Sequence, residues 1–191
     1  MIEIGFVRHG ITAWNDELRA QGSSDIPLNE EGLAQAWRVA ERLSAESWDI
    51  IYSSNLSRAH ETAKAIANKT GIPLQLDDRL RERGGGLIEG TIEEERVKKW
   101  GSNWRQMDLS METQESLIER GTSFMEELVG KHENQRILIV SHGAFLRRLL
   151  QNVVPDFNFD ESLKNTSVTS IVMMDKQWEC SLYNCTKHIV K

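Results

Sequence analysis

The sequence has few cysteines, and this excludes the chemistry that clustered thiols provide. Only Cys180 and Cys185 occur in the 191 residues, and no Cys-x-x-Cys pair is present. Thiolate zinc sites and dithiol redox sites therefore have no ligands to build on. The two cysteines fall in a predicted strand, where their odd spacing puts them on opposite faces. We expect them to remain unpaired, because a disulfide needs side chains that point toward each other.

A basic excess and long apolar runs are also missing. Lys and Arg number 23 against 29 Asp and Glu, for a formal net charge of -6. We expect no nucleic-acid partner, because that requires a basic face, although local charge can still hold a small anion. No apolar run is long enough to span a bilayer, and the first residues show no signal-peptide pattern. The expectation is a cytoplasmic protein without membrane association.

The apolar residues that are present follow two alternating periods. Short apolar runs typical of strands occur at residues 2–7, 50–53, 74–76, 137–140, 168–174 and 178–183. Between them, spacings of three and four predict helices, one capped by Asn29 and another from Leu117 to Val129. The core-facing side of the first of these is predicted to hold Leu33, Ala36, Trp37, Ala40 and Leu43.

This alternation of strands and helices predicts the fold class. It is typical of an α/β protein, here a three-layer α/β/α sandwich around a mostly parallel central sheet. A length of 191 residues suits a single domain with a sizeable core, so we expect one domain over residues 1–191. No pattern in the chain indicates an oligomeric state.

Three of the predicted strands end in residues suited to phosphoryl chemistry. The first ends in Arg8-His9-Gly10, the second is followed after one helical turn by Arg58, and the run 137–140 leads to His142. Parallel strands bring their carboxyl ends to one edge of a sheet, so these side chains are expected to converge. Guanidinium groups offer paired donors that match phosphate oxygens. Two arginines and two histidines around one point suit a phosphoryl group.

Each residue also has an ordinary structural explanation. An arginine near a strand end is more often a solvated charge, and a lone histidine there is more often a hydrogen-bonded structural residue. The His-Gly pair, however, follows an apolar run twice, at His9-Gly10 and at His142-Gly143. Glycine in that position lets a ligand approach the backbone. The repetition favours a functional site over coincidence.

Five segments match, in order, the pattern of a known family. Residues 8–15, Arg-His-Gly-Ile-Thr-Ala-Trp-Asn, are similar to the signature R-H-G-x-T-x-W-N. The other segments are residues 22–36, 53–63, 80–90, and 141–143 together with 165–169. With these motifs the chain resembles the histidine phosphatase superfamily, which includes the cofactor-dependent phosphoglycerate mutases. The resemblance covers nearly the whole chain.

The resemblance implies a mechanism with a phosphohistidine intermediate. His9 would attack phosphorus, which divides one difficult step into two easier ones. Arg8, Arg58 and His142 would hold the transferring group and its charge. Glu82 would protonate the leaving oxygen and then accept a proton from the attacking water. Residues expected to contact the phosphate or the rest of the substrate are Asn15, Gln21, Gly22, Gly143 and Ala144.

A second carboxylate, Glu89, could compete for the role of the acid, but the family pattern assigns that role to Glu82 and leaves Glu89 structural. No cofactor is implied and no metal is expected, because the arginines already supply positive charge. We therefore expect a metal-independent phosphomonoesterase that hydrolyses a small phosphorylated metabolite. Its specificity is expected to lie in the irregular stretch Gly101 to Glu115 and in the loop after Thr12.

Two alternatives stay open. One is a cofactor-dependent phosphoglycerate mutase. Mutases of the family usually have a longer segment between the acid and the second His-Gly than the interval from Glu82 to His142 offers. The other is a catalytically inactive module that binds a phosphorylated ligand. The presence of a nucleophile, His9, and an acid, Glu82, counts against this second alternative, because binding alone requires neither.

Overall fold

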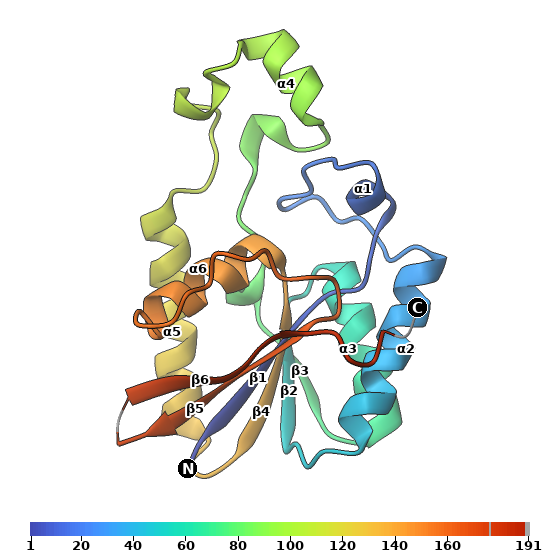
Figure 1. Cartoon of the computed structure of the whole chain (residues 1–191), viewed down its shortest axis with the longest axis vertical. Coiled ribbons are helices and arrows are strands. Elements are labelled where there is room, and N and C mark those ends of the chain that lie inside the picture. The colour runs from blue at the N-terminus through green and yellow to red at the C-terminus, as the bar shows by residue number, and fades with distance from the viewer. Residues whose placement is uncertain (176, 190–191) are drawn as a thin grey trace.

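The computed structural model describes residues 1–175 and 177–189, and a six-stranded sheet forms its centre (Figure 1). Its strands are β1 (Glu3–Arg8), β2 (Ile50–Ser53), β3 (Leu74–Leu76), β4 (Arg136–Ser141), β5 (Val168–Met174) and β6 (Gln177–Cys185). They lie in the order β3-β2-β4-β1-β5-β6. The pairs among β1 to β4 are parallel, whereas β5 pairs antiparallel with β1 and with β6. The predicted mostly parallel sheet is confirmed.

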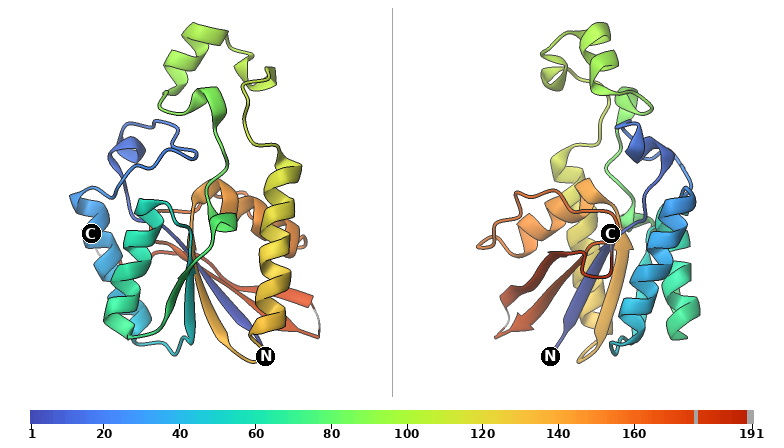
Figure 2. Two further views of the ribbon diagram at one scale, coloured as in Figure 1. Left: turned by 180° about the vertical axis from the view of Figure 1, so that it is seen from behind. Right: turned by 45° about the vertical axis from the view of Figure 1, so that its right-hand side comes forward.

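Helices cover both faces of this sheet, which confirms the predicted three layers. Helices α2 (Glu30–Ser44) and α3 (Ser57–Thr70) lie on one face, and α5 (Gln114–Lys131) and α6 (Gly143–Val153) lie on the other (Figure 2). Within β4, Ile137 and Ile139 belong to the apolar cluster under α5 and α6, while Leu138 and Val140 belong to the cluster under α2 and α3. Successive strand residues point to opposite faces, so a strand buried on both sides is apolar throughout.

The start of α2 is as predicted, and its buried face is so in part, since Ala36, Ala40 and Leu43 are buried. The side chain of Asn29 accepts a hydrogen bond from Gly32 N (2.8 Å), as a helix cap does. Leu33 and Trp37, however, are 47% and 57% exposed. The helix instead turns Gly32 inward, where the loop after β1 passes so close that a Cβ would lie 2.0 Å from Ile11 O. Close backbone packing at a glycine therefore determines which side of α2 faces the core.

A segment between β3 and α5 projects beyond the carboxyl ends of the strands (Figure 1). Its main element is α4 (Glu93–Trp100), followed by a single helical turn that contains Trp104. Trp104 packs with Ile88 and Leu109 in an apolar cluster separate from the two main ones. The loop that holds the short helix α1 (Ala13–Asp16) joins this projection, since Ala20 exchanges backbone hydrogen bonds with Gly90 and Thr91. Within the described residues no helix is long and apolar enough to cross a bilayer.

Candidate active site

The site is built where β1 and β4 end side by side. The two strands are parallel and their register pairs Arg8 with Ser141, so the two His-Gly pairs leave the sheet at the same level. As a result, the imidazole rings of His9 and His142 lie with their centroids 5.2 Å apart. The sequence repeat becomes a spatial pair because both strands end at one edge.

His9 is 2% exposed, and its local contacts determine which ring nitrogen is available. Its Nδ1 lies 2.6 Å from Gly10 O. A carbonyl oxygen can only accept, so Nδ1 carries the proton and Nε2 holds the free lone pair. Burial, together with the charges of Arg8 and Arg58, holds the pKa of His9 well below its usual range. The ring is therefore neutral at neutral pH, as a nucleophile must be.

His142 is neutral as well, but its two ring nitrogens are both engaged. Arg58 Nε donates to His142 Nδ1 (3.2 Å), so the proton of His142 is on Nε2, which lies 2.8 Å from Ser54 Oγ. Burial is the main cause that lowers the pKa of His142 well below its usual range, and the nearby Arg58 adds to it. His9 Nε2 makes no hydrogen bond in the part of the chain that the structure describes, so of the two histidines His9 is the one that presents a free nitrogen.

Arg58 comes from the first turn of α3 and is fully buried. Its Nη1 donates to Ser24 O (2.7 Å) and its Nη2 donates to Gly22 O (2.8 Å). Gly22 has a φ of +51°, a conformation that favours glycine and turns this carbonyl toward the guanidinium. Each terminal nitrogen keeps a second hydrogen. Gly22, for which a substrate contact was expected, thus supports the guanidinium of Arg58 in this structure.

Arg8 offers the clearest position for an anion. Its Nη1 donates to Leu163 O (2.6 Å), whereas its Nε is buried and has no hydrogen-bond partner within the described residues. Gly143 lies against this nitrogen, and a Cβ at that position would be 3.2 Å from Nε. A buried donor without a partner costs about 1–3 kcal/mol. An anionic oxygen bound there would remove that cost.

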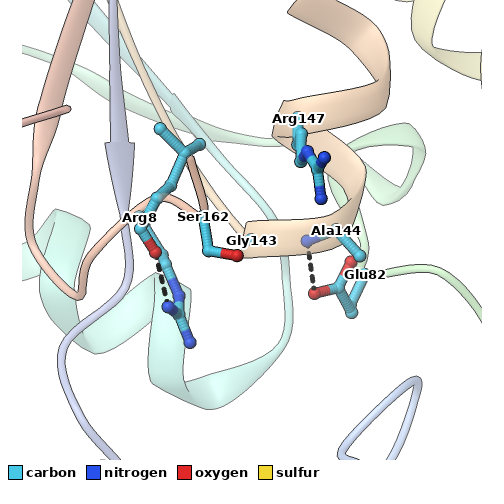
Figure 3. Close-up of a pocket in the computed structure, with 7 residues that line it drawn as sticks. Arg8, Glu82, Gly143, Ala144, Arg147 and Ser162 are labelled. Atoms are coloured by element: carbon cyan, nitrogen blue, oxygen red, sulfur yellow. Dashed lines mark hydrogen bonds between the residues drawn. The ribbon is translucent and has the colours of Figure 1, made fainter. Parts of the chain in front are cut away.

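The carboxylate of Glu82 lies in the same cavity (Figure 3). It accepts from Phe145 N (2.8 Å) and from Ala144 N (3.1 Å), so it caps the first turn of α6. The Ala144 amide, predicted to bind phosphate, is thus bonded to Glu82 in this structure. The cavity measures about 260 Å³, and its other lining residues are Arg8, Gly143, Arg147, Ser162 and Leu163.

The second carboxylate, Glu89, is occupied by the surrounding loops. It accepts from Ser23 N (2.8 Å), Ser24 N (3.0 Å), Ser24 Oγ (2.6 Å) and Gly85 N (2.8 Å). Burial raises the pKa of Glu89, but these hydrogen bonds together outweigh burial and bring the pKa below its usual value. Glu89 therefore joins the loop at residues 22–24 to the glycine-rich segment. This is a structural role.

Asn15 and Gln21 both lie in the loop after β1. Asn15 Oδ1 accepts from Thr12 N (3.1 Å), and Gln21 Oε1 accepts from the Thr12 hydroxyl (3.0 Å). Asn165, which the sequence analysis did not assign to the site, donates to Asn15 Oδ1 (3.3 Å) and to His9 O (3.0 Å). These contacts hold the oxygen ends of both amides. The amide nitrogens of Asn15 and Gln21 make no hydrogen bond in the described part of the chain.

Sequence reasoning missed Arg147 and Ser162, which line the cavity. Arg147 stands four residues after Gly143 and so one turn along α6, yet next to Arg148 it has the pattern of a solvated helix charge. Residues 101–115, where specificity was expected, are not among those that line this cavity. Among residues 1–175 and 177–189, no group of three His, Cys, Asp or Glu is placed to hold a metal ion.

The fold and the site together define an α/β protein with a cavity that is lined by two arginines and a carboxylate, a set of groups suited to phosphoryl chemistry. The chain belongs to the histidine phosphatase superfamily (branch 1), whose model matches residues 4–186. The resemblance of the five sequence segments is thereby confirmed.

Individual relatives cover nearly the whole chain. Phosphoglycerate mutase-like protein 4 of Arabidopsis thaliana is 38% identical, over 98% of this chain and 86% of its own length. The metal-independent phosphoserine phosphatase of the same plant is 33% identical, over 98% of this chain and 83% of its own. A phosphoserine phosphatase of Entamoeba histolytica, solved with phosphoserine, superposes with a TM-score of 0.82 at 28% identity, and each chain covers 100% of the other.

Proposed function

We propose that the protein is a metal-independent phosphomonoesterase that hydrolyses a small phosphorylated metabolite through a phosphohistidine on His9, with residues 1–191 acting as one domain. The observation that carries this proposal is the state of His9. Its ring is buried and kept neutral by burial and by the charges of Arg8 and Arg58, Gly10 O holds the proton on Nδ1, and Nε2 makes no hydrogen bond within the described residues. A neutral imidazole held in one tautomer among guanidinium groups is prepared to attack phosphorus.

In the first step, the lone pair of His9 Nε2 forms a bond to phosphorus while the bond from phosphorus to the ester oxygen breaks. Glu82, protonated, gives its proton to that oxygen, so an alcohol leaves. A protonated Glu82 accepts more weakly from Ala144 N, and this amide then becomes available to the phosphoryl oxygens. Arg8 and Arg58 balance the charge that develops on those oxygens.

In the second step, Glu82 is ionised and takes a proton from water. The oxygen of this water attacks phosphorus, and the bond to His9 Nε2 breaks. Inorganic phosphate leaves, and both residues return to their starting states. The amides of Ala144 and Phe145 donate to the Glu82 carboxyl group and hold it in the cavity. One carboxylate thus serves as acid and then as base.

The relatives support a small phosphorylated substrate, since two of them are phosphoserine phosphatases by name. The name of the Arabidopsis thaliana phosphoglycerate mutase-like protein keeps a mutase as the second candidate. Hydrolysis is favoured because, within the described residues, neither α4 nor the turn that contains Trp104 contributes a residue to the lining of the cavity at Glu82. A cytoplasmic location is part of the proposal and agrees with the free thiols of Cys180 and Cys185.

The test is rapid quench of the enzyme with phosphorus-labelled substrate. We expect a phosphoenzyme that is labile in acid and stable in alkali, with the label on His9. His9→Ala should abolish labelling and retain the native circular dichroism spectrum, because only a site residue is lost. Label on His142 or on a serine would reject the assignment. A mutase would return the label to a second hydroxyl of the product, whereas a phosphatase releases it as inorganic phosphate.

A further inference from the structure

Arg147 is a positive charge in the cavity for which the proposed reaction has no use. Figure 3 shows its side chain extending from α6 over the cavity on the side of Glu82 and Ala144. Its Nε donates to Phe159 O (3.0 Å). Within the described residues, its two terminal nitrogens make no hydrogen bond, and no carboxylate lies within 4.0 Å of them. The bond to Phe159 O therefore holds the guanidinium in place, while its two terminal nitrogens have no partner among the described residues.

The charges in the cavity show what kind of group could occupy it. The phosphoryl group is already served by Arg8 and Arg58, the two arginines next to His9. Among the described residues, Glu82 is the only acidic one that lines the cavity, and it carries no charge when it acts as the acid. Arg147 then faces a cavity with no negative charge left to balance it. A substrate with a single phosphate would leave this cation unpaired.

We propose that Arg147 binds a second anionic group of the substrate, either a carboxylate or a second phosphate. This inference rests on the proposed function and narrows its substrate class to phosphomonoesters that carry a second negative charge. A guanidinium binds such groups through two parallel hydrogen bonds, and the bond from Nε to Phe159 O keeps the outer edge of the fork free for them. Because the fork is already oriented, little side-chain entropy is lost on binding.

Arg148, the next residue of α6, provides a matched control. It carries the same charge on the same helix, but it donates to Gln151 Oε1 (3.1 Å) and is absent from the cavity lining. A loss that depends only on net charge or on helix stability should therefore affect Arg147→Met and Arg148→Met alike. A loss that depends on contact with the substrate should affect only Arg147→Met.

The experiment compares substrates that differ only in the second charge. 3-Phosphoglycerate is paired with glycerol 3-phosphate, where a hydroxymethyl group replaces the carboxylate, and propane-1,3-diol bisphosphate is paired with its monophosphate. Wild type should prefer the more anionic member of at least one pair. Arg147→Met should lower kcat/KM for that member about 10- to 100-fold, as expected for hydrogen bonds to a charged group, mainly through KM. The pair that responds identifies the carboxylate or the phosphate as the group recognised.

The member of each pair that carries only the one phosphate keeps this inference separate from the proposed function. In Arg147→Met, kcat/KM for glycerol 3-phosphate should fall by a clearly smaller factor than kcat/KM for 3-phosphoglycerate, whereas Arg148→Met should change neither by more than about threefold. Arg147→Lys should recover part of the preference because charge remains. Equal losses for both members of a pair would assign Arg147 a purely structural role. If wild type turns over none of these esters, the proposed function fails. In that case the affinities of the same pairs are measured by calorimetry. If the preference for the more anionic member persists in Arg147→Met, the inference about Arg147 is overturned.

Discussion

Replacing Glu82 with glutamine should slow the phosphorylation of His9 unequally for different leaving groups. Glutamine keeps the shape of the side chain but has no acidic proton to give. An alkoxide, which leaves from a sugar or glycerol phosphate, needs that proton in the transition state, whereas nitrophenolate can leave without it. Comparing the two leaving groups in Glu82→Gln therefore separates the loss of the proton donor from general damage to the site.

The magnitudes of the kinetic effect and of the stability effect of Glu82→Gln both follow from the contacts of this residue. General acid catalysis contributes about 10²- to 10⁴-fold, so this range is expected with an alkyl phosphate and a small effect with nitrophenyl phosphate. Glu82 also caps α6 through the amides of Ala144 and Phe145. Glutamine retains one of the two acceptor oxygens, so unfolding should become easier by about 1 kcal/mol. The variant should remain folded throughout the assay.

Glu89→Gln is the matched control. It is expected to lower stability more than Glu82→Gln does and to affect the two leaving groups alike. Its four donors share two carboxylate oxygens, and an amide leaves at least one pair without an acceptor. A loss of about 3 kcal/mol in unfolding free energy is expected, because hydrogen bonds to a charged group contribute about 1.5–3 kcal/mol each. Phosphorylation with the two leaving groups should fall by similar factors. The kinetic effect would come from the displaced loop.

The assay is the single-turnover rate of phosphoenzyme formation, which excludes the water-attack step in which Glu82 acts as base. Urea unfolding of each variant gives the stability. Equal losses with both substrates for Glu82→Gln would show that this residue does not protonate the leaving group. If Glu89→Gln alone gave the unequal pattern, the roles of the two carboxylates would be exchanged and the reasoning from their hydrogen bonds would be wrong.

Three other predictions concern charge in the site. His9 and His142 have native pKa values below their unfolded ones, so the unfolded chain binds more protons as the pH falls below about 6.5. Stability in urea should drop by about 1.4 kcal/mol per pH unit for each histidine, and a flat profile would contradict their burial as neutral rings. Arg58→Met removes the donor to Gly22 and Ser24 and should raise the inhibition constant of vanadate at least 10-fold, more than Arg58→Lys does. Exhaustive chelation should leave activity with nitrophenyl phosphate unchanged, whereas loss that zinc or magnesium restores would show that the arginines are insufficient.

Local sequence signals predicted most of the secondary structure because the forces involved act over a few residues. The run 137–140 lies within β4, and Asn29 caps α2. Each of these features depends on a backbone conformation or on a period that neighbouring residues impose. The exposed positions of Leu33 and Trp37 were not predictable in this way. They follow from the approach of a distant loop to Gly32.

The sequence by itself determined which residues could do phosphoryl chemistry, since Arg8-His9-Gly10 and His142-Gly143 repeat one short pattern at the ends of two apolar runs. Only the tertiary structure decided how they are used. The proton on His9 Nδ1, the bond from Arg58 to His142, and the place of Arg147 in the cavity all depend on groups that meet through folding. Protonation and hydrogen bonding respond to neighbours in space, and residues 84 positions apart along the chain, such as Arg58 and His142, become neighbours only when the sheet assembles.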